Sequence, residues 1–266
     1  MIFVTGATGT IGRALLAELG SEAVAVVRQS GRASASVVAD FDRPESFAGL
    51  FSPGDRLFLN SSLWPGFVAG HQAVIDLAAE AGVAQIVTVS VRGAAPGQPL
   101  GGGLHGLVDQ HLRASGVPWA ILQPTGFMQN FAADLDGDGV FHGSYGEARM
   151  NYIDARDIAS CARALLTRPV GASGDHVLTG PESRTHAEFA AVLSAATGRP
   201  IRYADLPVPE MGARLAAQGL PYVLAEYMAS FADDRWAPLT GTVKDLTGRE
   251  PRTLAAYAEE FLTPVP

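Results

Sequence analysis

Residues 5–12 read TGATGTIG and place three glycines close to the N-terminus. An apolar run, IFV, precedes them at residues 2–4, and apolar residues at helical spacing follow from residue 11 to residue 19. A helix that starts at these glycines directs its unpaired N–H groups and its positive end toward the strand tip, where a phosphate pair is held. Glycine also lets the backbone approach a ligand closely. The stretch therefore predicts a dinucleotide-binding turn made by Gly6, Thr8, Gly9, Thr10, Ile11 and Gly12.

A tight strand-to-helix turn without any ligand is the alternative explanation of these glycines. The position of the motif, after a strand and before a helix, favours the dinucleotide. A P-loop is excluded because no GK[ST] follows at the required spacing.

Composition limits the classes of protein to which the chain can belong. Its 266 residues carry a net charge of −8, which argues against a nucleic-acid partner. There is no uncharged apolar run of about 18 residues, and no basic segment precedes the first strand, so we expect a cytoplasmic protein without a membrane span. A single cysteine, Cys161, argues against disulfides and cysteine metal sites. Only one of the 19 basic residues is a lysine, Lys244.

Strand-like runs alternate with helical patterns along the first two thirds of the chain. We expect strands at 3–5, 23–28, 36–40, 56–60, 85–90, 119–124 and 176–180, and helices at 10–19, 66–81, 104–115, 155–167 and 185–197. This alternation predicts an α/β fold with a Rossmann-type, doubly wound parallel sheet.

The alternation of strands and helices becomes less regular after residue 124. We assign residues 1–150 to the dinucleotide-binding core, and residues 151–266 to the remaining sheet elements plus a small, mostly helical C-terminal substrate lobe interleaved with that core. Residues 93–103, GAAPGQPLGGG, are expected to form a flexible loop at the sheet edge. The acidic run at 134–139 lacks the glutamate of a calcium loop and is expected to be a solvated turn.

Four segments together resemble the NmrA-like atypical members of the short-chain dehydrogenase/reductase superfamily. They are TGATGTIG at 5–12, ASGVPWAILQPTGFMQN at 114–130, NYIDARDIASCARALL at 151–166 and TGPESRTHAEFAAVLSAATGRPIRY at 179–203. The resemblance implies a Rossmann sheet with a small C-terminal lobe and nicotinamide dinucleotide binding. Relatives of this kind are reductases of quinones, dyes or phenylpropanoid-like compounds, or redox-sensing regulators.

The YxxxK pair of many superfamily members is absent, because no tyrosine is followed by lysine four residues later. In NmrA-like relatives a lysine or histidine often begins the corresponding helix, four residues before an acid. His105 and Asp109 occupy these positions and are our candidate catalytic residues. We expect the carboxylate to orient the imidazole and to favour its charged form. The alternative is a histidine at a helix start with no chemical role.

Arginines at the end of the second strand predict NADPH as the cofactor. An acid at this position binds the ribose of NAD, whereas here Arg28 and then Arg32 follow the strand and suit a 2′-phosphate. Exposed loop arginines without a ligand are the alternative. Asp40, with Phe41 beside it, resembles the family residue that meets the adenine edge. Asn60, Ser61 and Ser90 follow later strands and are expected to line the rest of the groove.

Candidate substrate residues follow the sixth expected strand or lie near the fourth. Trp64, Phe127 and Met128 are candidate apolar walls, and Asn130, Tyr145 and Tyr152 are candidate polar groups, although each aromatic residue also suits a core. These residues favour a small aromatic or quinone-like substrate. We therefore expect an NADPH-dependent reductase, with a homodimer as a possible assembly. The alternatives are a non-catalytic NADP(H) sensor and an isomerase or cyclase that retains its cofactor.

Overall fold

A computed structural model describes residues 1–29 and 36–262. Its central sheet has seven parallel strands in the order β10-β6-β5-β4-β1-β2-β3. The strands are β1 (Ile2–Val4), β2 (Ala23–Val27), β3 (Ser36–Val38), β4 (Arg56–Leu59), β5 (Gln85–Val89), β6 (Trp119–Pro124) and β10 (Gly174–Leu178). Every strand expected from the sequence is present.

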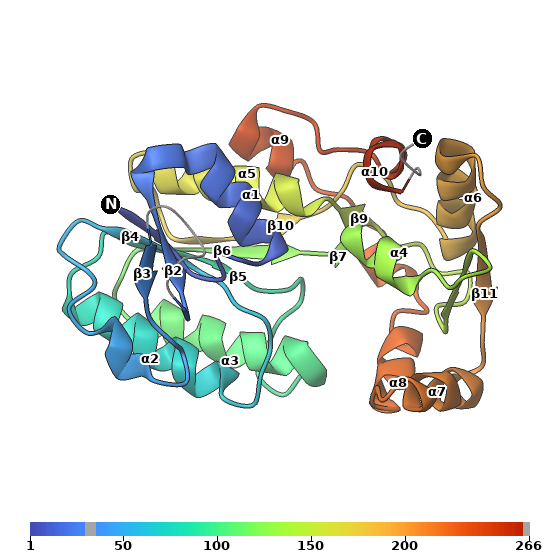
Figure 1. The fold of residues 1–266 in the computed structure, drawn as a ribbon, viewed down its shortest axis with the longest axis horizontal. Coiled ribbons are helices and arrows are strands. Elements are labelled where there is room, and N and C mark those ends of the chain that lie inside the picture. The colour runs from blue at the N-terminus through green and yellow to red at the C-terminus, as the bar shows by residue number, and fades with distance from the viewer. Residues whose placement is uncertain (30–35, 263–266) are drawn as a thin grey trace. The chain divides into compact units, whose positions relative to one another are not determined.

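Helices cover both faces of this sheet, as Figure 1 shows. On one face α1 (Thr10–Leu19) packs against α5 (Ala155–Thr167), and α9 (Thr242–Thr247) packs against α5 and β10. On the other face α2 (Phe67–Glu80) packs against α3 (Leu100–Ala114). Short 3-10 turns at Gly20–Glu22 and Pro44–Phe47 precede β2 and β4. The predicted Rossmann-type, doubly wound fold is confirmed.

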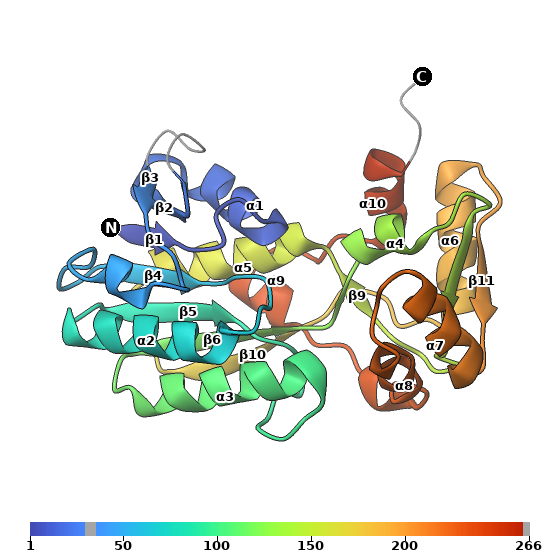
Figure 2. The ribbon, with the colours of Figure 1, turned by 60° about the horizontal axis from the view of Figure 1, so that its bottom comes forward.

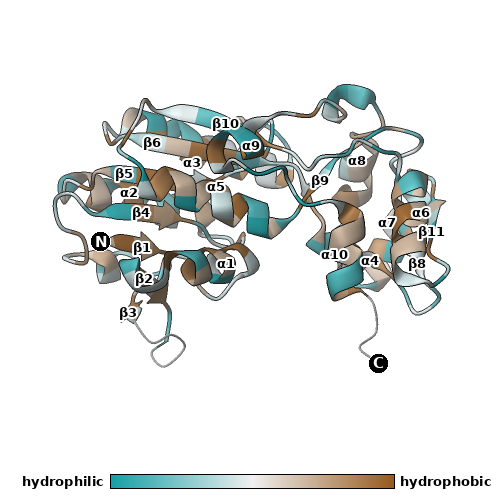
Figure 3. Ribbon diagram, turned by 90° about the horizontal axis from the view of Figure 1, so that it is seen from above, coloured by the Kyte–Doolittle hydropathy of each residue, from teal (hydrophilic) through white to brown (hydrophobic). Residues whose placement is uncertain are grey.

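The inner strands are apolar on both faces because helices cover both sides. All residues of β1, β2 and β5 are buried, and Figure 3 shows the apolar colouring of β1 and β2. The main core lies between the sheet and the pair α2 and α3, and its largest fully buried side chains include Phe47, Phe67 and Ile75. Burial of this apolar surface is the dominant favourable contribution to the fold.

One expectation about the sheet edge is wrong. The end of the stretch expected to be flexible, residues 100–103, forms the first turn of α3. A Cβ on Gly103 would lie 2.2 Å from the carbonyl oxygen of Gln98, and one on Gly106 would lie 2.2 Å from the carbonyl carbon of Ala95. These glycines are needed because the preceding loop packs directly against the helix backbone.

The chain divides into two compact units that are discontinuous in sequence. Unit 1 contains the central sheet and comprises residues 1–124, 155–178 and 242–249. Unit 2 comprises residues 125–154, 179–241 and 250–266. Its elements, which Figure 2 shows from a second direction, are β7 (Gly126–Phe127), α4 (Gln129–Asp134), β8 (Val140–Gly143), β9 (Tyr152–Ile153), α6 (His186–Thr197), β11 (Arg202–Asp205), α7 (Val208–Ala217), α8 (Val223–Ala229), a 3-10 turn at Asp234–Trp236 and α10 (Leu254–Phe261).

Unit 2 has its own core and two small parallel sheets. β7 pairs with β9, and β8 pairs with β11. Aromatic residues fill its core, among them Phe131, Phe141 and Phe189. The expected solvated turn is present, because the Asp136 carboxylate accepts the N–H groups of Asp138 and Val140.

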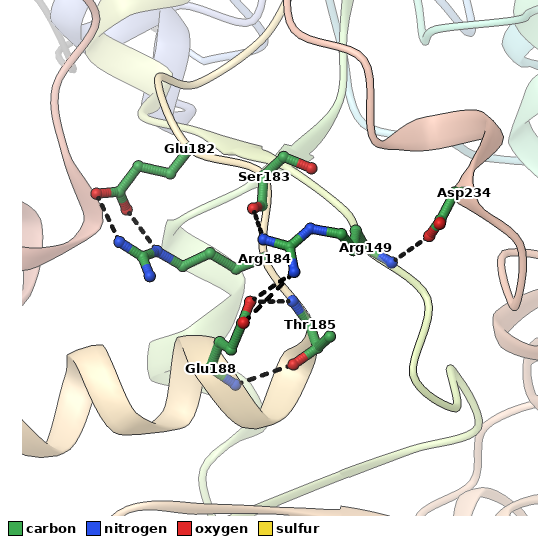
Figure 4. Close-up of polar contacts among 7 residues, drawn as sticks. All are labelled: Arg149, Glu182, Ser183, Arg184, Thr185, Glu188 and Asp234. Carbon is green, nitrogen blue, oxygen red and sulfur yellow. Dashed lines mark hydrogen bonds and ion pairs between the residues drawn. The ribbon is translucent and has the colours of Figure 1, made fainter.

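A polar network joins three segments of unit 2 (Figure 4). The Arg149 guanidinium donates to the Ser183 carbonyl and lies 3.2 Å from Glu188, while the Arg149 backbone N–H donates to Asp234 at 2.9 Å. Thr185 and Glu188 form a capping box at the start of α6. These contacts satisfy the charges within the network and account for it as a structural feature.

Candidate functional site

The turn after β1 is shaped by close packing at two of its glycines. Gly6 has a φ of +60°, and a Cβ there would lie 2.7 Å from the carbonyl oxygen of Asn60. A Cβ on Gly12 would lie 2.2 Å from the carbonyl oxygen of Gly6. Packing alone therefore explains glycine at position 12, whether or not its N–H group also faces a ligand.

The middle glycine, Gly9, has open surroundings. It is exposed and forms the N-cap of α1, and a Cβ there would meet only the Gly6 carbonyl oxygen, at 3.2 Å. The neighbouring Thr8 and Thr10 are also exposed, and no side chain among the described residues caps this end of the helix. Within that part of the chain, the N–H groups of the first turn thus lack side-chain acceptors at the positive end of a ten-residue helix. This cradle fits a pyrophosphate.

Thr5 connects this turn to the neighbouring strand and was missed by the sequence reasoning. Its hydroxyl accepts the N–H of Asn60 at 2.8 Å and lies 2.9 Å from the Asn60 carbonyl oxygen. The sheet order reverses between β1 and β4, so the turn and Asn60 lie together at the point where ligands of such sheets bind. A polar residue inside an apolar strand end was the signal for Thr5.

The residues expected around the ribose and adenine are placed at the ends of β2 and β3. Arg28 directly follows β2 and is exposed, and it forms no ion pair with any residue in the described part of the chain. Arg32 lies outside the described residues. Asp40 lies 3.9 Å from Arg43 and accepts the N–H of Asp42. Phe41 is half-buried beside it.

His71 is a neutral histidine that packs against Phe41, and the sequence reasoning also missed it. Its ring stacks on Phe41 at 4.6 Å, and its Nδ1 donates to the Phe67 carbonyl at 2.8 Å. Burial lowers the pKa of His71 to about 4. The Nε2 atom therefore carries a lone pair, 3.4 Å from the hydroxyl of Ser61. Its signal was a histidine on the apolar face of α2, four residues after Phe67.

Trp64 belongs to this aromatic cluster in unit 1. Its ring lies 5.5 Å from each of Phe41 and Phe67, and its Nε1 donates to Asp42 at 2.7 Å. These contacts give Trp64 a packing role beside the expected adenine residues. Whether it also meets a substrate stays a prediction.

The prediction that Asp109 orients His105 and favours the charged form of its imidazole is wrong. Burial lowers the pKa of His105 to about 4, so the imidazole is neutral at pH 7. Its ring meets the Phe67 ring edge to face at 4.9 Å. Asp109 instead accepts a hydrogen bond from the Ser90 hydroxyl at 2.6 Å. Spacing on one helix face did not pair the two side chains, because the Asp109 carboxyl group forms its hydrogen bond with Ser90, which follows β5.

The remaining substrate candidates lie in unit 2. Phe127 is half-buried in β7, Asn130 is exposed on α4, and Met128 is buried in the core. Tyr145 stacks on His186 with ring centres 3.9 Å apart. Tyr152 is buried, and its hydroxyl lies 2.8 Å from Nε2 of His186. His186 was not expected, since a histidine directly after a helix-capping threonine gave no distinct signal.

A model of the family described as NAD(P)H-binding matches residues 6–169. The chain belongs to this family. An NAD(P)H azoreductase from Xenophilus azovorans is 35% identical over 277 residues, which cover 97% of this chain and 97% of the relative. The solved structure of an NADPH-dependent quinone oxidoreductase from Escherichia coli, complexed with NADPH, covers 99% of this chain and 100% of its own, with a TM-score of 0.82 and 26% identity.

A second similar structure agrees in fold alone. The triphenylmethane reductase of Citrobacter sp., complexed with NADP(H), has a TM-score of 0.83 at 21% identity and covers 98% of this chain and 99% of its own. Together with the family match, these relatives confirm the prediction of an NAD(P)H-dependent oxidoreductase at this level of detail.

Membership of the NAD(P)H-binding family agrees with the cradle at Gly9 and with the switch point beside Asn60.

The single lysine of the sequence, Lys244, is exposed on α9 and belongs to unit 1. Within residues 1–29 and 36–262, no helix combines the length and the apolar character needed to cross a membrane.

Proposed function

We propose that this protein is an NADPH-dependent reductase of a small aromatic, azo or quinone-like compound. The observation that carries the proposal is the exposed, uncapped start of α1 at Gly9, in a chain that is similar over 97% of its length to an NAD(P)H azoreductase. The quinone oxidoreductase of Escherichia coli supports the same substrate class. We also propose that the chain belongs to the NmrA-like subgroup, on the four segments that resemble it.

The preference for NADPH over NADH rests on Arg28. A guanidinium at the end of β2 suits the 2′-phosphate, and the exposed position leaves it available for one. The first acids after Arg28 in the sequence, Asp40 and Asp42, follow β3 rather than β2 and take part in local contacts with Arg43 and Trp64. No acid therefore replaces Arg28 at the ribose position.

The chain's own residues would bind, orient and protect the reactants. The N–H groups at the start of α1 would hold the pyrophosphate, and Thr5 would fix Asn60 beside it. When bound, the dinucleotide supplies a hydride. His105, being neutral at pH 7, would serve as a hydrogen-bond donor or acceptor rather than as an imidazolium acid. We keep as proposals that unit 2 residues contact the substrate and that the protein forms a homodimer.

The test is the oxidation of NADPH, followed at the nicotinamide absorbance band, while azo dyes, quinones and enones are offered one at a time. We expect turnover with at least one azo or quinone compound. Tight NADPH binding without turnover of any compound would favour the sensor instead. Conversion of a compound without net oxidation of NADPH would favour the isomerase or cyclase.

A further inference from the structure

Ser90 and Asp109 form a buried hydrogen-bonded pair at the carboxyl end of β5. Ser90 follows β5, and Asp109 lies in the middle of α3. The exposed fractions of the two residues are 1% and 0%. The Ser90 hydroxyl lies 2.6 Å from Oδ2 of Asp109, whereas Oδ1 of Asp109 has no hydrogen-bond partner in the described part of the chain. A buried carboxyl group with one unpartnered oxygen is costly when it is ionised.

Charges around the pair only partly offset this cost. Burial raises the pKa of Asp109 to about 6, and Asp175 of β10 acts in the same direction, while the Ser90 hydrogen bond and Arg113 of α3 act against it. Arg113 and Asp175 pair with each other at 2.7 Å, so their effects on Asp109 largely cancel. His105, on the same helix, is neutral in this pH range. The protonation state of Asp109 is therefore decided mainly by its burial.

Protonation of Asp109 changes what the Ser90 hydroxyl can do. In the ionised state Asp109 can only accept, so the Ser90 hydrogen must point to it and Ser90 offers only lone pairs to any other group. In the protonated state the acid donates its own hydrogen to the Ser90 oxygen. The Ser90 hydrogen is then free to be donated to another acceptor.

We propose that Asp109 is a positioning residue that stores a proton and, through Ser90, delivers it to the substrate of the reduction. This inference rests on the proposed reductase function. With the hydride supplied by the bound dinucleotide, the substrate oxygen or nitrogen next to the reduced atom would take the Ser90 proton. Ser90 regains a proton from the Asp109 carboxyl group, which is left as a carboxylate and is reprotonated by water. The pair would thus replace the absent tyrosine and lysine as the source of the proton.

The first test does not depend on activity. Difference infrared spectroscopy of the full chain, titrated between pH 4 and pH 8, follows the carbonyl stretch of protonated carboxylic acids. We expect one band that disappears near pH 6 in the wild type, is absent in Asp109→Asn and is retained in Asp76→Asn, a control in which an exposed acid becomes an amide. In Ser90→Ala the band should shift in frequency and persist to higher pH, because the hydrogen bond that lowers the pKa is lost. A Ser90→Ala titration identical to the wild type would overturn the proposal.

The second test uses turnover with a naphthoquinone or an azo dye. We expect wild-type turnover to fall as pH rises through about 6, and Asp109→Asn and Ser90→Ala to lose that dependence together with about 10²-fold of the turnover, while the NADPH dissociation constant of Asp109→Asn stays within about twofold. Ser90→Thr, which keeps the hydroxyl, should recover most of the turnover. An equal loss at every pH, with the wild-type pH profile retained, would contradict proton storage and leave only a structural role. If the wild type oxidises no NADPH, the reductase proposal fails, and the infrared titration still decides whether Asp109 stores a proton coupled to Ser90.

Discussion

Two glycine-rich segments in unit 1, residues 5–12 and residues 100–106, begin helices, and Gly9 in the first differs from Gly103 and Gly106 in the second in what surrounds it. In the first segment, Gly9 is exposed and has almost no neighbour at the position of a Cβ. In the second, Gly103 and Gly106 are buried against the backbone of the loop at residues 95–98. One segment leaves its N–H groups open at the helix start, whereas the other fills the space around the helix with protein backbone. The comparison shows that clustered glycines indicate close approach, and that the approaching partner can be a ligand or the chain itself.

Gly106→Val tests the second segment and has the largest expected effect. The added Cβ would lie 2.2 Å from the carbonyl carbon of Ala95 and 2.5 Å from the nitrogen of Pro96. Because both are backbone atoms, the loop or the helix must move, and we expect the free energy of unfolding to fall by at least about 3 kcal/mol. Urea unfolding followed by circular dichroism measures this, and a loss below about 1 kcal/mol would show that the loop yields freely.

Asp109→Asn tests what the tight packing of α3 does to the acid it buries. A pKa raised from 3.8 to about 6 means that the folded protein binds more protons than the unfolded chain between these values, so wild-type stability falls as pH rises through this range. The variant should lack this fall, which amounts to as much as about 3 kcal/mol at about 1.4 kcal/mol per pKa unit. Unfolding free energies at pH 4 and pH 7 check it, and parallel changes in both proteins would contradict the burial of an ionised Asp109.

Gly9→Val tests the first segment. The Cβ would meet only the Gly6 carbonyl oxygen, at 3.2 Å, so we expect the fold to survive while the branched side chain blocks the pyrophosphate. The NADPH dissociation constant should rise by about 100-fold, which corresponds to about 2.7 kcal/mol. Titration by nicotinamide fluorescence measures it, with unfolding as the control. Normal NADPH binding by a folded Gly9→Val protein would show that Gly9 is not needed for the pyrophosphate.

Arg28→Ala tests whether the dinucleotide proposed to bind at the first segment is NADPH. Loss of a charge-assisted hydrogen bond to the 2′-phosphate costs about 1.5–3 kcal/mol, so NADPH affinity should fall by about tenfold or more while NADH affinity is nearly unchanged. Arg43→Ala is a control, since Arg43 is also exposed but lies near Asp40. An unchanged ratio of the two affinities in Arg28→Ala would remove the argument for NADPH.

Gly101→Ala should have the smallest effect and is the internal control for α3. Its Cβ would meet a terminal carbon of the exposed Leu63 side chain at 3.1 Å and Cδ2 of His105 at 4.0 Å, an ordinary contact distance. A flexible side chain can move away, and alanine favours a helix over glycine by about 1 kcal/mol. We therefore expect stability within about 1 kcal/mol of the wild type, or a slight gain. A loss as large as that of Gly106→Val would mean that the whole first turn is constrained.

The sheet could be predicted because its signals are local. Runs such as AVAVV at 23–27 are apolar, β-branched and short, and the helices between them show clear periodicity. The start of α3 could not be predicted, because glycine propensity opposes a helix and the contacts of Gly103 and Gly106 with the preceding loop at residues 95–98 explain it. Tertiary packing overrode the local preference at this point.

The chemistry of the candidate site was harder to predict than its position. The sequence predicted Ser90 in the cofactor groove and paired His105 with Asp109, but Asp109 accepts its hydrogen bond from Ser90, so the i, i+4 spacing suggested the wrong pair. Charge states also depend on burial, which the sequence does not reveal, and so the neutral forms of His105 and His71 were not foreseen. Thr5 was missed because its role depends on Asn60, more than fifty residues away.

The helix α9 has a consequence for how the protein is made. It belongs to unit 1 although residues 179–241, which precede it, belong to unit 2. Arg168 donates to the Leu246 carbonyl, and Arg249 donates to the Ser160 hydroxyl at 3.2 Å, so this late segment is bonded to the middle of α5 and to the residue that follows it. Synthesis of the 71 residues that follow Leu178, up to Arg249, takes roughly 4–14 s at about 5–20 residues per second. For that time a nascent chain displays the surface of α5 and β10 that Val243 and Leu246 later cover, and a fragment ending at the last sheet strand would display it permanently.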